Sequence, residues 1–348
     1  MNAWIVGFTL STGLMAPASG PATATPPPGL TSGPAVGARV IARSAETVLK
    51  VGSTVVASER LHRVYRVARR DGPWLWLVSG EVRGWARAED VIPFDRAIDH
   101  FTREIARDPK NAWAFLMRGI VAYDLKDYDR ALADDTEAIR LDPKDAVAYH
   151  NRGNAWLAKK ESGRAIADYD AAIRLDPKDA ASYHNRARAR ETARDYHLAI
   201  ADENLAIRLD PKDAAKYHLR ARAWAAVGAY DQALDDAARA VALDPEDASA
   251  LNIRAWIWAT CPEAKYRSGK QGVEAATRAC ALTGGRDPYL LGTLAAASAE
   301  AGDFRAAVDW QTKALARFRA AGGNIEKDRE RLALYRAGKP FRDAPAAP

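Results

Sequence analysis

The sequence Asp-Pro-Lys-Asp-Ala stands at residues 142–146, 176–180 and 210–214, with the variants DPKNA at 108–112 and DPEDA at 244–248. The prolines of these phrases recur at one constant spacing: Pro109, Pro143, Pro177, Pro211 and Pro245. Proline cannot continue a helix, and a flanking aspartate can cap the next one. A fixed period of about 34 residues is typical of stacked helix–turn–helix units, so the phrase predicts an all-α superhelical solenoid.

Within each period, aromatic and small residues return at matching places. The repeat after Pro143 has Tyr149, Gly153, Trp156, Ala165 and Tyr169. The two that follow have Tyr183, Ala187 and Ala199, and then Tyr217, Ala221, Trp224 and Ala233. Small residues let two helices approach closely, and the aromatic rings fill the gaps between repeats. The pattern resembles the tetratricopeptide repeat (TPR), and the resemblance covers residues 94–338.

This resemblance implies a solenoid of about six helical hairpins that begins on a half repeat. Residues 94–107 match the second helix of a repeat, with Ala97 at the close-contact position. Residues 261–269 insert about five extra residues into one turn, after which the register resumes. Residues 324–336 are expected to form a charged capping helix, because a terminal repeat would otherwise expose an apolar face. Residues 339–348 are expected to be a tail.

Residues 35–93 change from helical to strand periodicity. Asp71-Gly72 and Ser79-Gly80 are hairpin turn signals on either side of a segment that contains Trp74 and Trp76. Together with Gly84-Trp85, this order of elements resembles a bacterial SH3-like small β-barrel. The resemblance implies a surface, formed by Tyr65, Trp74, Trp76 and Trp85, for a proline-rich peptide or a cell-wall glycopeptide. The alternative is that one face of the strands is core and the other packs on the first helices, so that the barrel only caps the solenoid.

Residues 1–38 contain no charged side chain. Residues 3–15 are mostly apolar, and Ala16-Pro17-Ala18 has the small-x-small form of a signal-peptidase site. We therefore expect residues 1–18 to be a signal peptide and the chain to be exported, periplasmic or secreted. If residues 1–18 are not a signal, the chain is expected to be cytoplasmic. Residues 19–34, rich in Pro and Thr, read as a disordered linker.

Composition excludes several classes of function. The net charge of +6 is mild for 348 residues, so no nucleic-acid partner is expected. No apolar run is long enough for stable membrane insertion. The sequence lacks phosphate-binding glycine loops, zinc spacings and nucleophile motifs, so we expect no enzyme activity, no cofactor and no metal. Cys261 and Cys280 are expected at opposite ends of paired helices, too far apart for a disulfide.

The first helix of each repeat is expected to line a concave groove for an extended peptide or a partner helix. We call the groove-lining positions of these first helices, which recur in every repeat, the first-helix face. Its candidate binding residues are Trp113, Leu116, Met117, Ile120, His150, Asn151, Asn154, His184, Asn185, Arg188, His218 and Arg222. Asn and Arg side chains there can hydrogen-bond a peptide backbone or a carboxylate. The alternative is a solvated face copied by duplication. Because His150, His184 and His218 stand in line, they suit no tetrahedral metal site.

A second periodic pattern pairs arginines with aspartates. Arg118, Arg152, Arg186, Arg220 and Arg254 recur on the first helices, and Asp134, Asp168, Asp202 and Asp236 on the second. An unpaired buried guanidinium is costly, so the two rows are predicted to form structural ion pairs.

The sequence as a whole indicates a non-enzymatic protein–protein interaction scaffold. One alternative is a cell-envelope module whose barrel contacts peptidoglycan while the repeats act as a spacer. Another is an accessory or carrier subunit of a separate enzyme.

Overall fold

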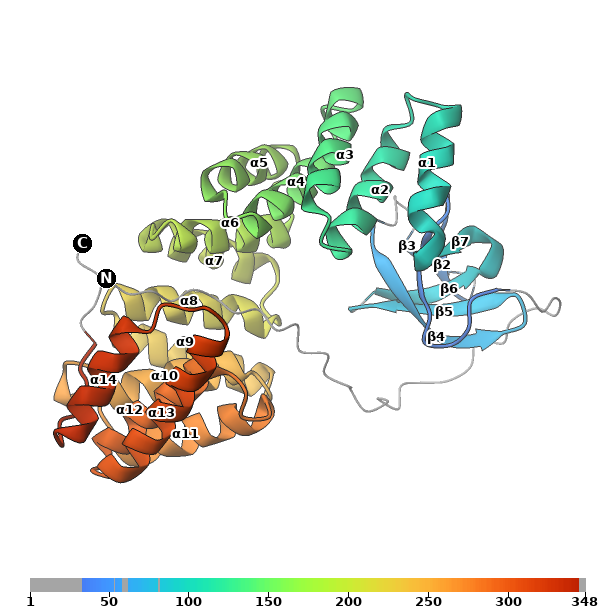
Figure 1. The fold of residues 1–348 in the computed structure, drawn as a ribbon. Helices are drawn as coiled ribbons and strands as arrows, with labels where there is room; N and C mark the ends of the chain where they lie inside the picture. The colour runs from blue at the N-terminus through green and yellow to red at the C-terminus, as the bar shows by residue number, and fades with distance from the viewer. Residues whose placement is uncertain (1–32, 53, 58–61, 81, 344–348) are drawn as a thin grey trace. The chain divides into compact units, whose positions relative to one another are not determined.

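The computed structural model describes residues 33–52, 54–57, 62–80 and 82–343 (Figure 1). The predicted signal peptide and nearly all of the predicted linker lie outside these residues. The described chain divides after Pro177 into two compact units. The first holds a β region and helices α1–α5, and the second holds helices α6–α14. This order confirms a small β region followed by a TPR-like helical solenoid.

The β region is a sheet of seven strands in which every described pairing is antiparallel. The strands are β1 (Arg39–Ala42), β2 (Leu49–Val51), β3 (Thr54–Ala57), β4 (Val64–Asp71), β5 (Trp74–Ser79), β6 (Val82–Arg87) and β7 (Val91–Pro93). They lie in the order β3-β2-β6-β5-β4-β1-β7, so β3 and β7 are the edges of an open sheet. That this sheet is an SH3-like domain stays a prediction.

The two turn signals of the β region lie where the sequence predicts them. Asp71 pairs with Trp74 across the β4–β5 turn, and Ser79 pairs with Val82 across the β5–β6 turn. Gly72 and Gly80 adopt φ of 56° and 59°, values that glycine reaches without strain.

Helices follow the sheet as antiparallel hairpins. Those of the first unit are α1 (Ala97–Arg107), α2 (Ala112–Asp124), α3 (Tyr128–Leu141), α4 (Ala146–Ala158) and α5 (Ser162–Leu175). Those of the second are α6 (Ala180–Thr192), α7 (Tyr196–Leu209), α8 (Ala214–Ala226), α9 (Tyr230–Leu243), α10 (Ala248–Thr260), α11 (Gly269–Leu282), α12 (Pro288–Glu300), α13 (Phe304–Ala320) and α14 (Glu326–Arg336). Short 3₁₀ turns lie at η1 (Ala88–Asp90), η2 (Phe94–Arg96) and η3 (Ala264–Tyr266).

The repeated phrase ends one helix and caps the next. Asp145, Asp179, Asp213 and Asp247 are the N-cap residues of α4, α6, α8 and α10, and each side chain accepts a hydrogen bond from a backbone N–H of the first turn. The sequence prediction for the aspartates is therefore confirmed at four places. Such a cap typically contributes about 1 kcal/mol to helix stability.

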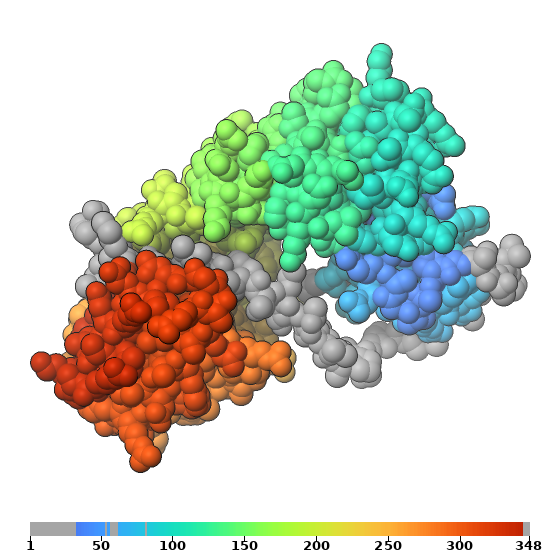
Figure 2. All heavy atoms as spheres, in the orientation of Figure 1, coloured from blue at the N-terminus to red at the C-terminus, as the bar shows by residue number. Residues whose placement is uncertain are grey.

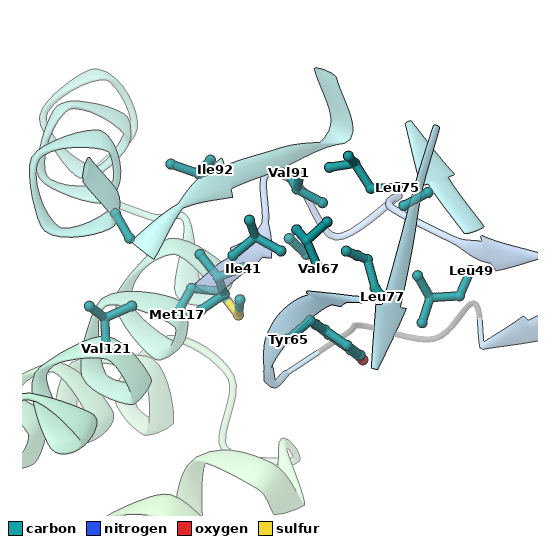
Figure 3. Packing of buried hydrophobic residues seen from close by; sticks show 14 of the residues in the cluster. Ile41, Leu49, Tyr65, Val67, Leu75, Leu77, Val91, Ile92, Met117 and Val121 are labelled. Atoms are coloured by element: carbon teal, nitrogen blue, oxygen red, sulfur yellow. The ribbon is translucent and has the colours of Figure 1, made fainter. Parts of the chain in front are cut away.

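The sheet and the first helices share one hydrophobic core. Ile41, Leu75 and Leu77 from the strands are buried in the same cluster as Met117 and Val121 from α2 (Figure 3). The β region therefore covers apolar surface of the first hairpin, which supports the prediction that it caps the solenoid.

The extra turn of residues 261–269 brings the start of α11 against the end of α12. A Cβ atom at Gly269 would lie 2.4 Å from the backbone nitrogen of Ala301, so a side chain there requires a backbone shift. We expect Gly269→Ala to lower the free energy of unfolding by about 1–3 kcal/mol. Gly163→Ala is the matched control, because Gly163 also lies in a first helical turn and its Cβ would meet nothing within 4 Å. Denaturant unfolding that ranks the two variants equally would contradict this packing.

Candidate functional site

The candidate residues of α2 form core rather than ligand-accessible surface. Leu116 and Met117 are both 0% exposed, and Met117 points toward the strand residues of the shared core (Figure 3). Trp113 and Ile120 are partly buried and pack against the same cluster. The expectation that the groove begins with an apolar stretch on α2 is corrected accordingly. Met117 is covered by the sheet, whereas Leu116 is buried against Ala138 of α3 and Ala148 of α4.

The candidate residues of α4 are polar and half-buried. Tyr169 of α5 donates a hydrogen bond of 2.7 Å from its hydroxyl to Asn154 Oδ1. Its ring meets His150 edge-on at 5.8 Å between centroids. A Cβ at Gly153 would lie 2.8 Å from the same ring, so the glycine makes room for the tyrosine. The polar row of α4 is thus oriented by one buried aromatic side chain of its own hairpin.

The candidate residues of α6 and α8 are held by partners inside the second unit. His184 Nδ1 lies 2.8 Å from Glu203 Oε1, and His218 Nδ1 lies 2.7 Å from Asp247 Oδ2. Two nitrogens of Arg222, Nε and Nη2, contact the two carboxylate oxygens of Glu191. The side chains of His184, His218 and Arg222 are between 18% and 21% exposed. Each therefore reaches solvent while its polar group is held by an acidic partner.

The remaining two candidates of α6 contact each other. Arg188 Nη1 donates to Asn185 Oδ1 at 3.1 Å, and both side chains are half-buried. Arg188 also lies close enough to His184 to help lower the pKa of that imidazole. The candidate residues of α6 and α8 are therefore polar side chains held by neighbouring groups of the same unit.

A buried acidic residue lies beneath this face, and sequence reasoning missed it. Glu203 of α7 is 0% exposed, and burial raises its pKa to about 9. Burial likewise lowers the pKa of His184 to about 3. At neutral pH the pair is therefore a protonated carboxyl group hydrogen-bonded to a neutral imidazole, because both charged forms lose their hydration. Within the described chain, Glu203 Oε2 is buried with no hydrogen-bond partner.

Lys216 is a buried charged residue close to this neutral pair. It is 3% exposed, and its Nζ donates to Asp210 at 2.7 Å and to Asp213 at 2.6 Å. Burial alone would lower the pKa of Lys216, but the two hydrogen bonds outweigh burial and raise it. The lysine therefore stays charged and acts in the repeat-to-repeat turn rather than on the binding face.

A signal for Glu203 is present in the sequence. The same position of successive second helices carries Asp135, Tyr169 and Glu203, a row of polar groups where the core would otherwise be apolar. All three are buried, at 1%, 0% and 0% exposure. Reading this position along the repeats would have identified the polar layer beneath the first-helix face.

The predicted arginine–aspartate pairs are confirmed on four rungs. Each arginine donates from Nε and Nη2 to both oxygens of the aspartate 16 residues later, at 2.6–3.0 Å, in the pairs Arg118–Asp134, Arg152–Asp168, Arg186–Asp202 and Arg220–Asp236. This bidentate geometry is the strong form of the interaction. Arg254 has no matching aspartate in α11, because the insertion shifts the register and Ala275 stands at the position that corresponds to Asp236. The Arg254 guanidinium instead lies 4.6 Å from the Trp258 ring centroid.

The same arginines also connect successive hairpins. The remaining nitrogen, Nη1, donates to a side chain of the preceding second helix. The distances are 3.1 Å from Arg118 to Thr102, 3.3 Å from Arg152 to Thr136 and 2.7 Å from Arg220 to Asn204. One guanidinium therefore joins three helices, which makes the row structural.

The predicted surface of the β region is only partly accessible. Tyr65 is 2% exposed and belongs to the core, and Trp85 is 8% exposed. Trp74 and Trp76 are half-buried on the face opposite the buried Leu75 and Leu77. Tyr65 is therefore corrected from a surface to a core residue, because it points to the leucine side of the sheet. The two half-buried tryptophans remain candidates for contact with a ligand.

The two cysteines are free and buried, and burial raises the pKa of Cys280 to about 11. Within the part of the chain that the structure describes, no cluster of His, Cys, Asp and Glu could hold a metal ion. Over the same residues, no helix has both the length and the apolar character needed to cross a membrane.

An open, mainly apolar pocket of about 620 Å³ lies among the last hairpins of the second unit. Its lining includes Val273 and Cys280 of α11, Leu294 of α12 and Trp310 of α13. None of the candidate binding residues of the first-helix face lies in its lining, so the two are separate.

Known proteins share the helical architecture. Two models of the tetratricopeptide repeat match residues 94–146 and 146–179. The APC/C hetero-tetramer Cut9–Hcn1 is similar with a TM-score of 0.59 and 14% identity, over 70% of this chain and 46% of that one. No curated protein sequence matches the chain.

Smaller TPR structures also match. The Arabidopsis OM64 TPR domain is 30% identical over 32% of this chain and 93% of its own, with a TM-score of 0.32. YrrB, a TPR protein with an unusual peptide-binding site, is 21% identical over 53% of this chain and 92% of its own, with a TM-score of 0.45. From the repeat models, the constant spacing of the prolines and the stacked hairpins together, we conclude that this chain contains tetratricopeptide repeats.

Proposed function

We propose that the repeats are a protein-interaction scaffold, and that the first-helix face of α6 and α8 binds an extended segment of a partner protein. The observation that supports this most directly is the fixed orientation of its polar heads. His184, His218 and Arg222 are each anchored by a buried or half-buried carboxyl group. A side chain that is already ordered loses little rotamer entropy when a ligand arrives. A row of such groups suits the carbonyls and carboxylates of an extended chain.

The charged side chains of α6 and α8 indicate which kind of partner segment this face would bind. Arg188 and Arg222 project from adjacent first helices, and the side-chain amide of Asn185 carries both donor and acceptor groups. Arg222 engages the carboxylate of Glu191 and Arg188 donates to Asn185, so both guanidiniums are held in fixed orientations. The preferred ligand is therefore an extended segment with at least one acidic side chain.

This function is tested by photo-crosslinking from position 185 in the full chain, followed by affinity measurements with the captured segment. Arg188→Ala is expected to weaken binding at least ten-fold, since a central arginine of an interface commonly contributes about 2 kcal/mol. Arg208→Ala, an exposed arginine at the end of α7, is the control and is expected to bind like the parent chain. Equal affinity of the Arg188→Ala variant would refute the proposal.

A second candidate function is contact with the cell wall through the β region. The half-buried pair Trp74 and Trp76 favours it, because exposed tryptophan faces stack on sugars and prolines. This function requires export, which the expected signal at residues 1–18 would provide. In co-sedimentation of the full chain with peptidoglycan, the Trp74→Ala/Trp76→Ala variant should be lost from the pellet. Tyr123→Ala, which removes an exposed aromatic ring of α2, should be retained.

A further inference from the structure

The chain turns back on itself after α14. Gly338 adopts a left-handed φ of 66°, and the backbone nitrogen of Lys339 donates to Leu334 O, which closes the helix. Pro340 then prevents a further helical turn. The next three residues, Phe341, Arg342 and Asp343, are half-buried although they follow the last element of the fold. Figure 2 shows the C-terminal helices, in red, as one continuous surface of the second unit.

This tail lies along the C-terminal turn of α10. The backbone nitrogen of Asp343 donates to Thr260 O at 2.9 Å, and Arg342 Nη1 donates to Ala259 O at 3.3 Å. The last carbonyls of a helix lack partners within it and carry partial negative charge, so they attract donors and cations. The tail supplies both, one from its backbone and one from a guanidinium.

Side chains fix the tail in one register. Trp256 Nε1 donates to Asp343 Oδ2 at 2.7 Å, and the Trp256 and Phe341 ring centroids are 6.0 Å apart. Arg331 of α14 lies over both rings, 5.0 Å from the first centroid and 4.9 Å from the second. An aromatic, a basic and an acidic side chain of the tail are thus involved in separate contacts.

The extra turn of residues 261–269 has a part in this contact. Arg267 from that turn donates from Nε to Glu300 Oε1 at 3.1 Å, and Arg342 Nη2 lies 2.6 Å from Glu300 Oε2. Arg267 Nη1 also donates to the carbonyls of Cys261 and Pro262, which anchors it to the end of α10. The insertion therefore holds a carboxylate, 15% exposed, in position for the tail arginine.

Trp256, which the tail contacts, is equivalent in the repeat to the proposed binding arginines. Trp256 occupies the position that Arg188 and Arg222 hold in the two preceding repeats, so it is the next residue of the first-helix face. The tail therefore contacts, on α10, the same helix position that carries the proposed binding arginines on α6 and α8. It does so as a short non-helical segment, with one backbone and several side-chain hydrogen bonds, which is how a bound peptide would be held.

We propose that residues 339–343 are an intramolecular ligand of the first-helix face of α10, and that this surface accepts a partner's extended aromatic–basic–acidic segment once the tail leaves. This inference rests on the proposed function only in that a first-helix face binds extended chains. It adds that the site on α10 is closed by the chain's own tail and has a sequence preference of its own. The apparent affinity for such a segment is reduced by the fraction of molecules in which the tail is docked.

The test uses a fluorescent peptide with the sequence of residues 338–345, GKPFRDAP, and measures its binding by polarisation. A chain that ends at Gly338 is expected to bind it at least ten-fold more tightly than the full chain, because the competing segment is gone. The same peptide with alanine at the positions of Phe341 and Asp343 should not bind. Equal binding to both chains, or no binding to a shortened chain whose circular dichroism is that of the parent, would overturn the proposal.

A full-length variant keeps the test decisive if the shortened chain fails to fold. Phe341→Ala/Asp343→Ala should release the tail and let the peptide bind, whereas Lys339→Ala, at an exposed residue of the same tail, should still exclude it. A dimer by light scattering that disappears in the Phe341→Ala/Asp343→Ala variant would show that a second copy supplies the tail, and would overturn the intramolecular assignment. The peptide assay reports on α10, whereas the crosslinking assay from position 185 reports on α6 and α8, so failure of the proposed function is distinguished from failure here.

Discussion

Asp202→Ala is expected to lower the free energy of unfolding of the repeats by about 3–5 kcal/mol. Asp202 is 1% exposed and receives Nε and Nη2 of Arg186 at 3.0 and 2.6 Å, together with Nη1 of Arg190 at 2.7 Å. The substitution removes a carboxylate that two guanidiniums share, while both guanidiniums stay where water reaches them poorly. Water cannot fully hydrate these two guanidiniums in the folded variant, so the loss of stability exceeds that expected for an exposed ion pair.

Urea unfolding followed by circular dichroism measures this effect. Asp235→Ala is the control, since Asp235 is exposed on α9 and its removal should change stability by no more than about 0.5 kcal/mol. On another rung, replacing both partners, Arg152→Met with Asp168→Leu, should cost much less than Asp168→Ala alone, because no charge is left buried. A loss below about 1 kcal/mol for Asp202→Ala, the value of an exposed pair, would mean that the pairs are not structural.

The second large effect is expected from Glu203→Gln, which should stabilise the protein at neutral and alkaline pH. Folding keeps the Glu203 carboxyl protonated, with a pKa of about 9 against an ordinary value of 4.5. At pH 7 the folded state must therefore take up a proton, and at about 1.4 kcal/mol per pKa unit this costs on the order of 3 kcal/mol. Glutamine has the shape of the protonated acid and can donate to His184 without that cost.

The stability difference between Glu203→Gln and the parent protein is expected to depend on pH. Below pH 4.5 the carboxyl is protonated in both states, so Glu203→Gln should change stability little. As pH rises from 4.5 to 9, only the unfolded parent loses this proton, and the advantage of the variant should grow. His184 acts in the opposite direction: its folded pKa of about 3 makes the parent lose stability as pH falls below 6.5, and the variant should keep that loss. Chemical unfolding at pH 5 and pH 8 measures both.

Glu330→Gln provides the comparison, because Glu330 is exposed on α14 and its substitution should be insensitive to pH. If Glu203→Gln destabilises the protein at pH 8, the His184–Glu203 pair is a true ion pair in the folded state, and the assignment of two neutral groups is refuted.

The sequence predicts well whatever repeats at short range. The prolines and aspartates of the repeated phrase specify helix ends and caps, and the arginine–aspartate pairs follow because each joins residues 16 apart within one hairpin. The polar candidates His184 and Arg188 recur as His218 and Arg222 in the next repeat, and whether they form a binding site stays a prediction. Local geometry, repeated unchanged, is sufficient for all of these.

Other features depend on contacts between distant parts of the chain. Leu116 and Met117 match a groove position by periodicity, yet both are buried. Met117 packs in the core shared with the sheet, and Leu116 packs with Ala138 and Ala148 of the next two helices. Glu203 changes protonation because neighbouring helices exclude water from it.

The contact between the tail and α10 is the clearest example of a feature that depends on distant parts of the chain. Trp256 and Asp343 are 87 residues apart, and no repeat relates them. By itself, the sequence determined the pitch of the helices, their caps and the pairing inside each hairpin, because these depend on neighbours at fixed short spacing. Only the tertiary structure decided which of the repeated positions stay open, which are covered by the sheet, and which are occupied by the chain's own end, because burial depends on all the surfaces that meet at a point.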